Sequence, residues 1–413
     1  MFNIAKKILI ITIIVIFIIA FSASYNYSNI DSLAFVVAMG IDVSETKALK
    51  VTFQFVTPPS TNEGSNQESK IIEDSVECDS IVNAINIMNS YLARKLDLSH
   101  CRIIVFSEEI AKRGISDYIY TLMNDVQVRP SSNLIVSKCN ASYYIKNSIP
   151  SLETSITRYY DLFTSSEKYT GYLTNATIGD FINAILCPYC QPYTILGGVS
   201  SSKDSSNSLA YDDSNTKANS SPISGTRSTE NIGTAVFNEG KLVGELTGIE
   251  TMCLNLLRGN LNSAVISIPN PTAESSENSQ NNSNEKIDLL ILPDSEAKIK
   301  VDIVNGSPYV KIDIKLSSKL FSLSKDSNYH TSESLSAISN SCSKYLESLI
   351  TNFLYKTSIE FKSDINGLGK YSLYNFTTNQ EFNDYNWHNN YSSSTFDVNV
   401  NTTIDSGLLL KET

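Results

Sequence analysis

The stretch Ser32-Leu-Ala-Phe-Val-Val-Ala-Met-Gly-Ile-Asp42, followed by Leu49-Lys-Val-Thr-Phe-Gln-Phe-Val56, decides the fold of the amino-terminal half of this chain. Residues 33–38 are a continuous apolar run, which is typical of a buried strand. The second segment alternates apolar and polar residues, which predicts a strand with one buried face. We therefore expect two strands that flank a turn at Gly40-Ile-Asp42.

Strand and helix signals alternate after this pair. Apolar residues at helical spacing over residues 81–92 predict a helix capped by Asp79 or Ser80, and residues 102–106 form a short apolar strand. Ser107 is expected to cap a helix that carries the apolar residues up to Leu122, and residues 134–136 are expected to form another strand. This alternation predicts an α/β or α+β body with its helices packed on one sheet.

The clearest local signal lies in the carboxy-terminal part of the chain. Ile299, Val301 and Ile303 alternate with Lys and Asp, and the alternation resumes at residues 310–316 after Asn305-Gly306. An Asn-Gly pair between two such segments predicts a β-hairpin. Residues 338–354 then carry apolar side chains at helical spacing, and residues 396–402 alternate again, so this part reads as strand, strand, helix and strand.

Two segments rich in Ser, Asn and Asp divide the chain. Residues 200–229 and 272–285 have almost no large apolar side chains, so they cannot bury enough surface to offset the entropy of ordering. The predicted fold class is α+β, with a membrane segment followed by about three domains built on mixed or antiparallel sheets. The expected divisions are a signal or anchor segment at 1–24, an α/β domain at 25–195, a Ser/Asn-rich loop at 196–230, a middle region with a polar loop at 231–285 and an α+β domain at 286–413.

The first 24 residues have the pattern of an export signal or a membrane anchor. Lys6 and Lys7 precede an apolar run over residues 8–21 whose only polar member is Thr12, and no Lys or Arg follows until Lys47. Because Lys and Arg hold the amino end in the cytoplasm, we expect the rest of the chain on the outer face of a membrane. The run is shorter than the about 20 residues that span a bilayer, and small residues suited to signal peptidase follow it. Both an uncleaved anchor and a cleaved signal therefore remain open.

The composition excludes several classes of function. The chain has 413 residues and a formal net charge of -11, so it lacks the basic surface with which proteins displace counterions from nucleic acid. Its three histidines and seven scattered cysteines show no metal-ligand spacing. The sequence therefore predicts no nucleic-acid partner, no metal site, no cofactor and no catalytic residues.

Cys187-Pro-Tyr-Cys190 is the motif that most suggests chemistry, because it matches the dithiol motif of glutaredoxins. That chemistry requires the first cysteine at a helix N-terminus. Here Cys187 follows a helix-like run, and Pro192 opposes a helix start after it, so the context argues against a redox role. A structural disulfide between Cys187 and Cys190 and a pair of free thiols are the other two interpretations.

Three further features each have a structural interpretation beside a functional one. His100-Cys101 is not a nucleophile pair, because adjacent residues on a strand point to opposite faces. Asp364 with Gly367 and Gly369 supplies one carboxylate, too few ligands for calcium, and its glycines favour a tight turn. Trp387, the only tryptophan, is either an interface anchor or a cap on the core of the last domain.

Several stretches, taken in order, form one pattern. They are residues 32–42 and 51–58, Leu96-Asp-Leu-Ser-His100, residues 103–106 and 111–114, Gly233-Thr-Ala-Val-Phe237, residues 242–244, Leu246-Thr-Gly-Ile-Glu-Thr251, Asp364, Gly367, Gly369, Trp387 and residues 396–407. The ordered set resembles the Ger(x)C family, the C subunits of bacterial spore germinant receptors. The resemblance covers most of the chain after residue 31, with spacers at the two polar segments.

The resemblance implies a non-enzymatic subunit of a nutrient-sensing complex in the spore inner membrane, beside two membrane-spanning partner subunits. Two departures from the family pattern stand out. The position of the cysteine that is usually lipidated holds Ser24, whose hydroxyl cannot form the thioether, so direct anchoring by residues 8–21 is favoured. The aromatic residue that is usual within the 364–369 motif is replaced by Asn366.

The sequence thus predicts a non-catalytic, membrane-anchored subunit of a germinant receptor. One alternative is an extracytoplasmic thiol-disulfide protein that uses Cys187 and Cys190. Another is a protein that binds a small nutrient itself, which would require a large pocket with convergent polar groups between domains.

Overall fold

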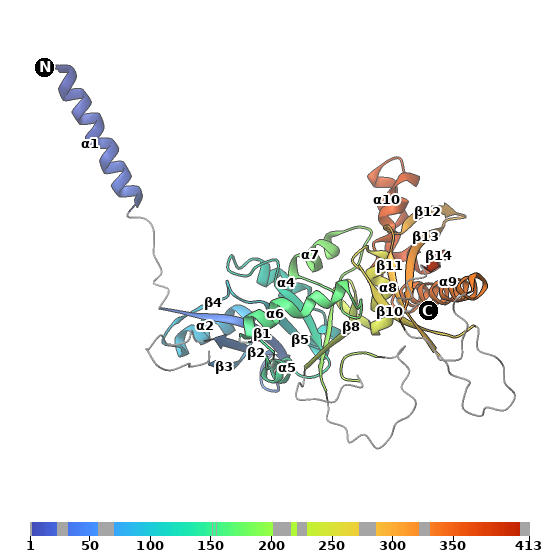
Figure 1. Ribbon diagram of the computed structural model, residues 1–413. Coiled ribbons are helices and arrows are strands. Elements are labelled where there is room, and N and C mark those ends of the chain that lie inside the picture. The colour runs from blue at the N-terminus through green and yellow to red at the C-terminus, as the bar shows by residue number, and fades with distance from the viewer. Residues whose placement is uncertain are drawn as a thin grey trace, which may run out of the picture.

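The computed structural model describes residues 2–22, 32–56, 70–150, 152–153, 155–200, 216–220, 229–271, 286–321 and 331–404. Within these ranges the chain is a mixed α+β structure with two sheets (Figure 1). We call the larger sheet with its helices the first body, and the smaller sheet with its helices the second body. Most of the two predicted polar segments, and all of Ser24, lie outside the described residues.

The sheet of the first body has nine strands among the described residues, in the order β3-β2-β1-β5-β6-β7-β8-β9, with β4 paired to the start of β1. The central pairs from β1 through β7 are parallel and the outer pairs are antiparallel. The almost continuous burial of β1, β5 and β6 follows from this central position, because helices cover both faces of the sheet. The strands are β1 (Leu33–Val43), β2 (Leu49–Val56), β3 (Ile71–Cys78), β4 (Lys95–Asp97), β5 (Ile103–Ser107), β6 (Asn133–Ser137), β7 (Tyr193–Val199), β8 (Thr229–Asn238) and β9 (Lys241–Leu246).

Two apolar clusters place the helices on opposite faces of this sheet. One cluster contains α2 (Ile81–Tyr91), α3 (Glu108–Arg113), α4 (Ser116–Met123) and α7 (Ile178–Leu186). The other contains α5 (Ala141–Asn147) and α6 (Ile156–Leu162), which η2 (Phe163–Lys168) extends. The predicted single helix after Ser107 is wrong, because Gly114, with a φ of 116°, ends α3 before α4 begins.

The predicted turn at Gly40-Ile-Asp42 is also wrong, because these residues belong to β1. A Cβ on Gly40 would lie 2.9 Å from Ile145 Cδ1 and 3.2 Å from Ala141 Cβ, so the glycine leaves space for α5. Asp42 is 4% exposed and accepts hydrogen bonds from the N–H groups of Ala141 (2.6 Å) and Ser142 (2.9 Å). The motif therefore seats the N-terminus of α5 on the sheet, as a carboxylate does at a helix start.

The sheet of the second body has five strands among the described residues, in the order β10-β11-β13-β12, with β14 parallel to β13. The predicted hairpin is confirmed, since β12 and β13 pair antiparallel around Asn305 and Gly306. Their φ values of 51° and 84° are those that a two-residue hairpin loop requires. The strands are β10 (Ala264–Pro269), β11 (Lys286–Pro293), β12 (Lys298–Val304), β13 (Ser307–Leu320) and β14 (Thr395–Ile404).

α9 (Ser332–Tyr355) packs on this second sheet, and α8 (Gly248–Leu257) packs against α9. α9 is the predicted long helix, and it buries Ile338, Cys342, Leu346 and Ile350 in the apolar cluster of the second body. α8 belongs to the same cluster, and all of its residues except Glu250 are buried. The remaining elements are η4 (Lys356–Glu360), η5 (Leu368–Asn375), α10 (Asn379–Tyr385), α11 (Trp387–Asn390) and η6 (Tyr391–Ser393).

The predicted middle region, 231–285, contributes to both bodies. Nearly all of β8 and the whole of β9 come from it and extend the first sheet, whereas β10 from the same region forms an edge of the second sheet. α8 lies between these two contributions in the chain. The domain boundaries remain a prediction, which limited proteolysis would test.

The amino-terminal segment forms α1 (Phe2–Ser22), which lies apart from both bodies in Figure 1. The side chains that are described on this helix, residues 4–17, are all exposed. Among the described residues, no helix combines the length and the apolar character that crossing a membrane demands.

Replacing Asp42 with Ala should lower the free energy of unfolding by about 1–2 kcal/mol, because the first N–H groups of α5 lose their acceptor. Urea denaturation of the full chain measures this. The matched control is Asp79→Ala, which removes an exposed ion pair with Lys47 and should change stability by less than about 0.5 kcal/mol. Equal losses in the two variants would contradict the capping role of Asp42.

Candidate functional site at the junction of the two bodies

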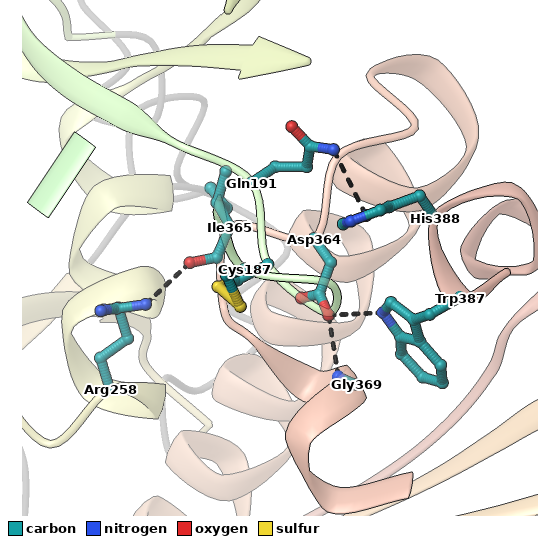
Figure 2. Close-up of a disulfide and its surroundings, with 9 residues drawn as sticks. Cys187, Gln191, Arg258, Asp364, Ile365, Gly369, Trp387 and His388 are labelled. Carbon is teal, nitrogen blue, oxygen red and sulfur yellow. Dashed lines mark hydrogen bonds between the residues drawn. A yellow bond between two sulfur atoms is a disulfide. The ribbon is translucent and has the colours of Figure 1, made fainter. Parts of the chain in front are cut away.

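The residues that follow α7 form a loop, 187–192, through which the first body contacts the second. Cys187 is the C-cap of α7, and its N–H donates to the carbonyl of Ala184 (3.3 Å). A disulfide joins Cys187 to Cys190, with their Cα atoms 5.5 Å apart (Figure 2). Glutaredoxin-like chemistry needs a thiolate at a helix N-terminus, whereas the C-terminal end of a helix, where Cys187 lies, carries partial negative charge. The oxidation state of this pair in the mature protein remains a prediction.

The second body meets this loop with a turn at residues 364–369. Asp364 is 1% exposed, and its Oδ2 accepts hydrogen bonds from the Gly369 N–H (2.9 Å) and the Trp387 indole N–H (2.9 Å), as Figure 2 shows. Its backbone carbonyl accepts a hydrogen bond from the N–H of Gln191 (2.9 Å). Burial raises the pKa of Asp364 to about 6, although its hydrogen-bond donors act in the opposite direction. One residue therefore connects the turn, the tryptophan and the loop of the first body.

Close packing explains the glycine at the end of this turn. A Cβ on Gly369 would lie 2.6 Å from both Trp387 Nε1 and Tyr189 Cβ, so a side chain there would separate the loop from the turn. Gly367 has a φ of 69°, in the left-handed region that glycine adopts without strain. Trp387 is 1% exposed and belongs to the apolar cluster of the second body. The indole is thus a core residue whose N–H reaches the junction.

Polar contacts on either side of the disulfide extend the junction. Arg258, the C-cap of α8, donates from its guanidinium to the carbonyl of Ile365 (2.9 Å). Gln191 Nε2 lies 3.3 Å from His388 Nδ1, and Gln191 Oε1 accepts a hydrogen bond from the N–H of Glu239 (3.0 Å). Burial lowers the pKa of His388, which favours the neutral ring that can accept this bond.

A second set of contacts lies beside β9. The ring of Phe361 packs directly on Gly244, where a Cβ would lie 2.1 Å from the ring carbon Cε1. Lys356 Nζ lies 2.8 Å from both carboxylate oxygens of Glu250, and Glu250 also forms a capping box with Thr247 at the start of α8. The second body therefore contacts the first along β9 as well as at the 187–192 loop.

α8 lies between these two contact regions, and the first body hydrogen-bonds the buried Thr251 hydroxyl and the Asn255 amide N–H groups. The hydroxyls of Thr251 on α8 and Thr234 on β8 are 3.0 Å apart. Asn255 Nδ2 donates to the carbonyls of Gly171 (3.0 Å) and Leu173 (2.8 Å). Buried polar groups are costly unless they are hydrogen-bonded, so these contacts fix the helix against the first body while its apolar residues pack in the second.

The other candidate residues do not form a site. His100 is exposed and packs against the ring of Phe35, whereas Cys101 is buried, and burial raises the pKa of its thiol to about 12. Among the described residues, no group of three or more His, Cys, Asp or Glu side chains could hold a metal ion. The absence of a cofactor remains a prediction.

Two family models match the two parts of the chain that meet at this junction. The model described as "Spore germination protein N-terminal domain" matches residues 26–196, and the model described as "Spore germination B3/ GerAC like, C-terminal" matches residues 232–407. The chain belongs to the Ger(x)C family, the C subunits of spore germinant receptors. A solved structure described as "Crystal Structure of the GerBC protein" is similar, with a TM-score of 0.49 at 17% identity over 89% of this chain and 96% of that chain. No curated protein matches this chain.

Several buried polar atoms of the junction have no hydrogen-bond partner. Both polar atoms of the Asn366 side chain, and Oδ1 of Asp364, are buried without a hydrogen-bond partner. An aromatic side chain at position 366 would require no such partner. Asn366 therefore places an unsatisfied amide in the junction.

The pKa of Asp364 predicts a pH dependence of stability. Its folded value of about 6 exceeds the ordinary 3.8, so the folded protein retains a proton over a pH range in which the unfolded chain has lost it. The stabilising contribution of the Asp364 proton is fully present below about pH 4, and it is lost as the pH rises through about 6. Relative to Asp364→Asn, the wild type should lose about 1–3 kcal/mol between pH 4 and pH 7 by urea denaturation. A stability difference that does not change with pH would contradict this assignment.

Replacing Asn366 with Leu should raise the free energy of unfolding by about 1 kcal/mol, because it removes a buried amide without partners. Asn255→Leu is the matched control. It removes an amide that donates two hydrogen bonds and should lower stability by at least about 1 kcal/mol. If both variants lose stability equally, the amide of Asn366 has partners in solution.

Proposed function

We propose that this chain is a non-catalytic, membrane-attached subunit of a spore germinant receptor, which assembles with two membrane-spanning subunits and helps to trigger germination. The observation that carries the proposal is that family models for both halves of such proteins match, over residues 26–196 and 232–407. The subunit lies at the spore inner membrane with most of its chain on the outer face.

Attachment to the membrane is assigned to the amino-terminal segment. Lys6 and Lys7, followed by the apolar residues of α1 and a stretch without Lys or Arg, support export of the rest of the chain. The exposed apolar side chains over residues 4–17 are suited to a lipid environment. Ser24 supports attachment through this segment, because a serine cannot carry the thioether-linked lipid.

The two alternatives have weaker support. A thiol-disulfide enzyme would need Cys187 at a helix N-terminus, but it caps a C-terminus. A nutrient-binding protein would need a pocket with free polar groups. The cavity beside the disulfide has a volume of about 310 Å³, at the lower limit for ligand sites, and a larger cavity of about 540 Å³ is lined by residues of the first body alone and not by both bodies. Two polar residues of the cavity beside the disulfide are already engaged, Asp180 in the cap of α7 and Arg258 with Ile365.

Affinity purification of the tagged full chain from detergent-solubilised spore membranes tests the assembly. We expect two multi-spanning proteins to purify with it in comparable amounts, and neither to purify with an unrelated tagged protein anchored in the same membrane. Purification of the chain without any multi-spanning protein would contradict the proposal.

The membrane-extracted protein should retain an intact amino terminus, because Ser24 cannot be lipidated. Intact-mass measurement tests this. In a Ser24→Cys variant, lipidation would instead give a chain that begins at residue 24 with added lipid mass, which is the matched comparison. A wild-type chain that begins near residues 22–25 and remains in the soluble fraction would contradict direct anchoring.

A further inference from the structure

The disulfide lies in the 187–192 loop, the segment of the first body that contacts the 364–369 turn of the second body. Between its two cysteines, Tyr189 packs its ring edge-on against Phe382, with 6.3 Å between ring centroids. Directly after it, the N–H of Gln191 donates to the carbonyl of Asp364. The Cβ of Cys190 itself would lie only 3.7 Å from a Cβ on Gly367. The covalent ring therefore holds a loop whose shape decides how the bodies meet.

The disulfide is also accessible from solvent. Cys187 and Cys190 are both partly exposed and line a cavity of about 310 Å³ together with Asn183, Tyr193 and Arg258. Most of the other described cysteines are free and buried, namely Cys78, Cys101, Cys253 and Cys342, whereas Cys139 is free and half-buried. A thiol reagent in solution can therefore reach the Cys187–Cys190 bond without unfolding the core.

We propose that the Cys187–Cys190 disulfide is a thiol-exchange site that sets how firmly the two bodies are joined, and that a dithiol reductant loosens the junction. A thiolate of the dithiol attacks one sulfur of the disulfide and forms a mixed disulfide, while the other cysteine leaves as a thiolate and takes up a proton. The second thiol of the reductant then closes its own disulfide and releases the remaining cysteine as a thiol. Two electrons and two protons pass from the dithiol to the pair. This site is a substrate of exchange, independent of the proposed receptor function.

Reduction acts on the junction through the conformational freedom of the loop. The closed ring restricts residues 187–190 before they dock, whereas the reduced loop must be ordered each time the junction forms. For so short a ring, the loop-closure relation gives a change of roughly tenfold in the population of the open junction. The open state, in which the contacts of Gln191 and Tyr189 are lost, should therefore be populated roughly tenfold more often after reduction, while both cores remain folded.

Hydrogen exchange of the full chain, with and without dithiothreitol, tests the proposal. Peptides that cover residues 188–192 and 364–369 should exchange roughly tenfold faster after reduction. The amides of Ala141 and Ser142, which are bound to Asp42 in the first body, should not change. The emission of Trp387, the only tryptophan and a donor to Asp364, should shift to longer wavelength.

A Cys187→Ser/Cys190→Ser variant should show the reduced behaviour with and without dithiothreitol, and Cys139→Ser should respond as the wild type does. Alkylation and mass spectrometry report the oxidation state in every sample. The proposal is overturned if the two cysteines are thiols in the protein as purified, if dithiothreitol leaves them oxidised, or if they are reduced while exchange at the junction is unchanged. The comparison of wild-type protein with and without dithiothreitol does not depend on whether any variant folds.

Discussion

The buried carboxylate of Asp364 is the interaction on which the junction of this structure depends. A carboxyl group removed from water requires hydrogen-bond donors, and here the Gly369 N–H and the indole of Trp387 supply them. Those two bonds fix the course of the turn. The carbonyls of Asp364 and Ile365 then face Gln191 and Arg258, on either side of the disulfide. A single buried group thus orders the surface that the second body presents to the first.

The rest of the interface makes the two bodies act together. α8 packs its apolar residues in the second body while Thr251 and Asn255 bind the first, and Phe361 closes on Gly244 at a separate point. Interfaces between domains of one chain are often small and mobile, but a buried helix that is hydrogen-bonded to the other body resists separation. If the proposed partner subunits displace one body, the other body moves with it. Such coupling is suited to transmitting a signal and requires no chemistry at the junction.

Local patterns in the sequence predicted the elements that depend on near neighbours. The hairpin at Asn305-Gly306 and the long helix α9 agree with the structure because period and turn residues alone specify them. The prediction of a turn at Gly40-Ile-Asp42 failed because Gly40 and Asp42 both contact α5, which is distant in the sequence. The glycine leaves space for α5, and the aspartate accepts hydrogen bonds from its first N–H groups.

The junction could not be derived in the same way, since it joins residues from distant parts of the chain. Two signals pointed to it without specifying it. The glycines at 367 and 369 beside Asp364 indicated a tight turn, and Trp387 was expected to be either an interface anchor or a cap on the core of the last domain. Neither signal identifies the distant residues that it contacts, because packing across an interface leaves no periodicity in the sequence.

The most direct test of this account is equilibrium unfolding in urea followed by two probes in the full chain, one in each body. Trp387 emission reports the second body, and pulsed thiol labelling of the buried Cys101 reports the first. If the junction joins the bodies into one cooperative unit, both probes should give the same midpoint in the wild type, and the midpoints should separate in Asp364→Ala. Protection of Cys101 in wild-type protein at urea concentrations where Trp387 is already exposed would contradict the account.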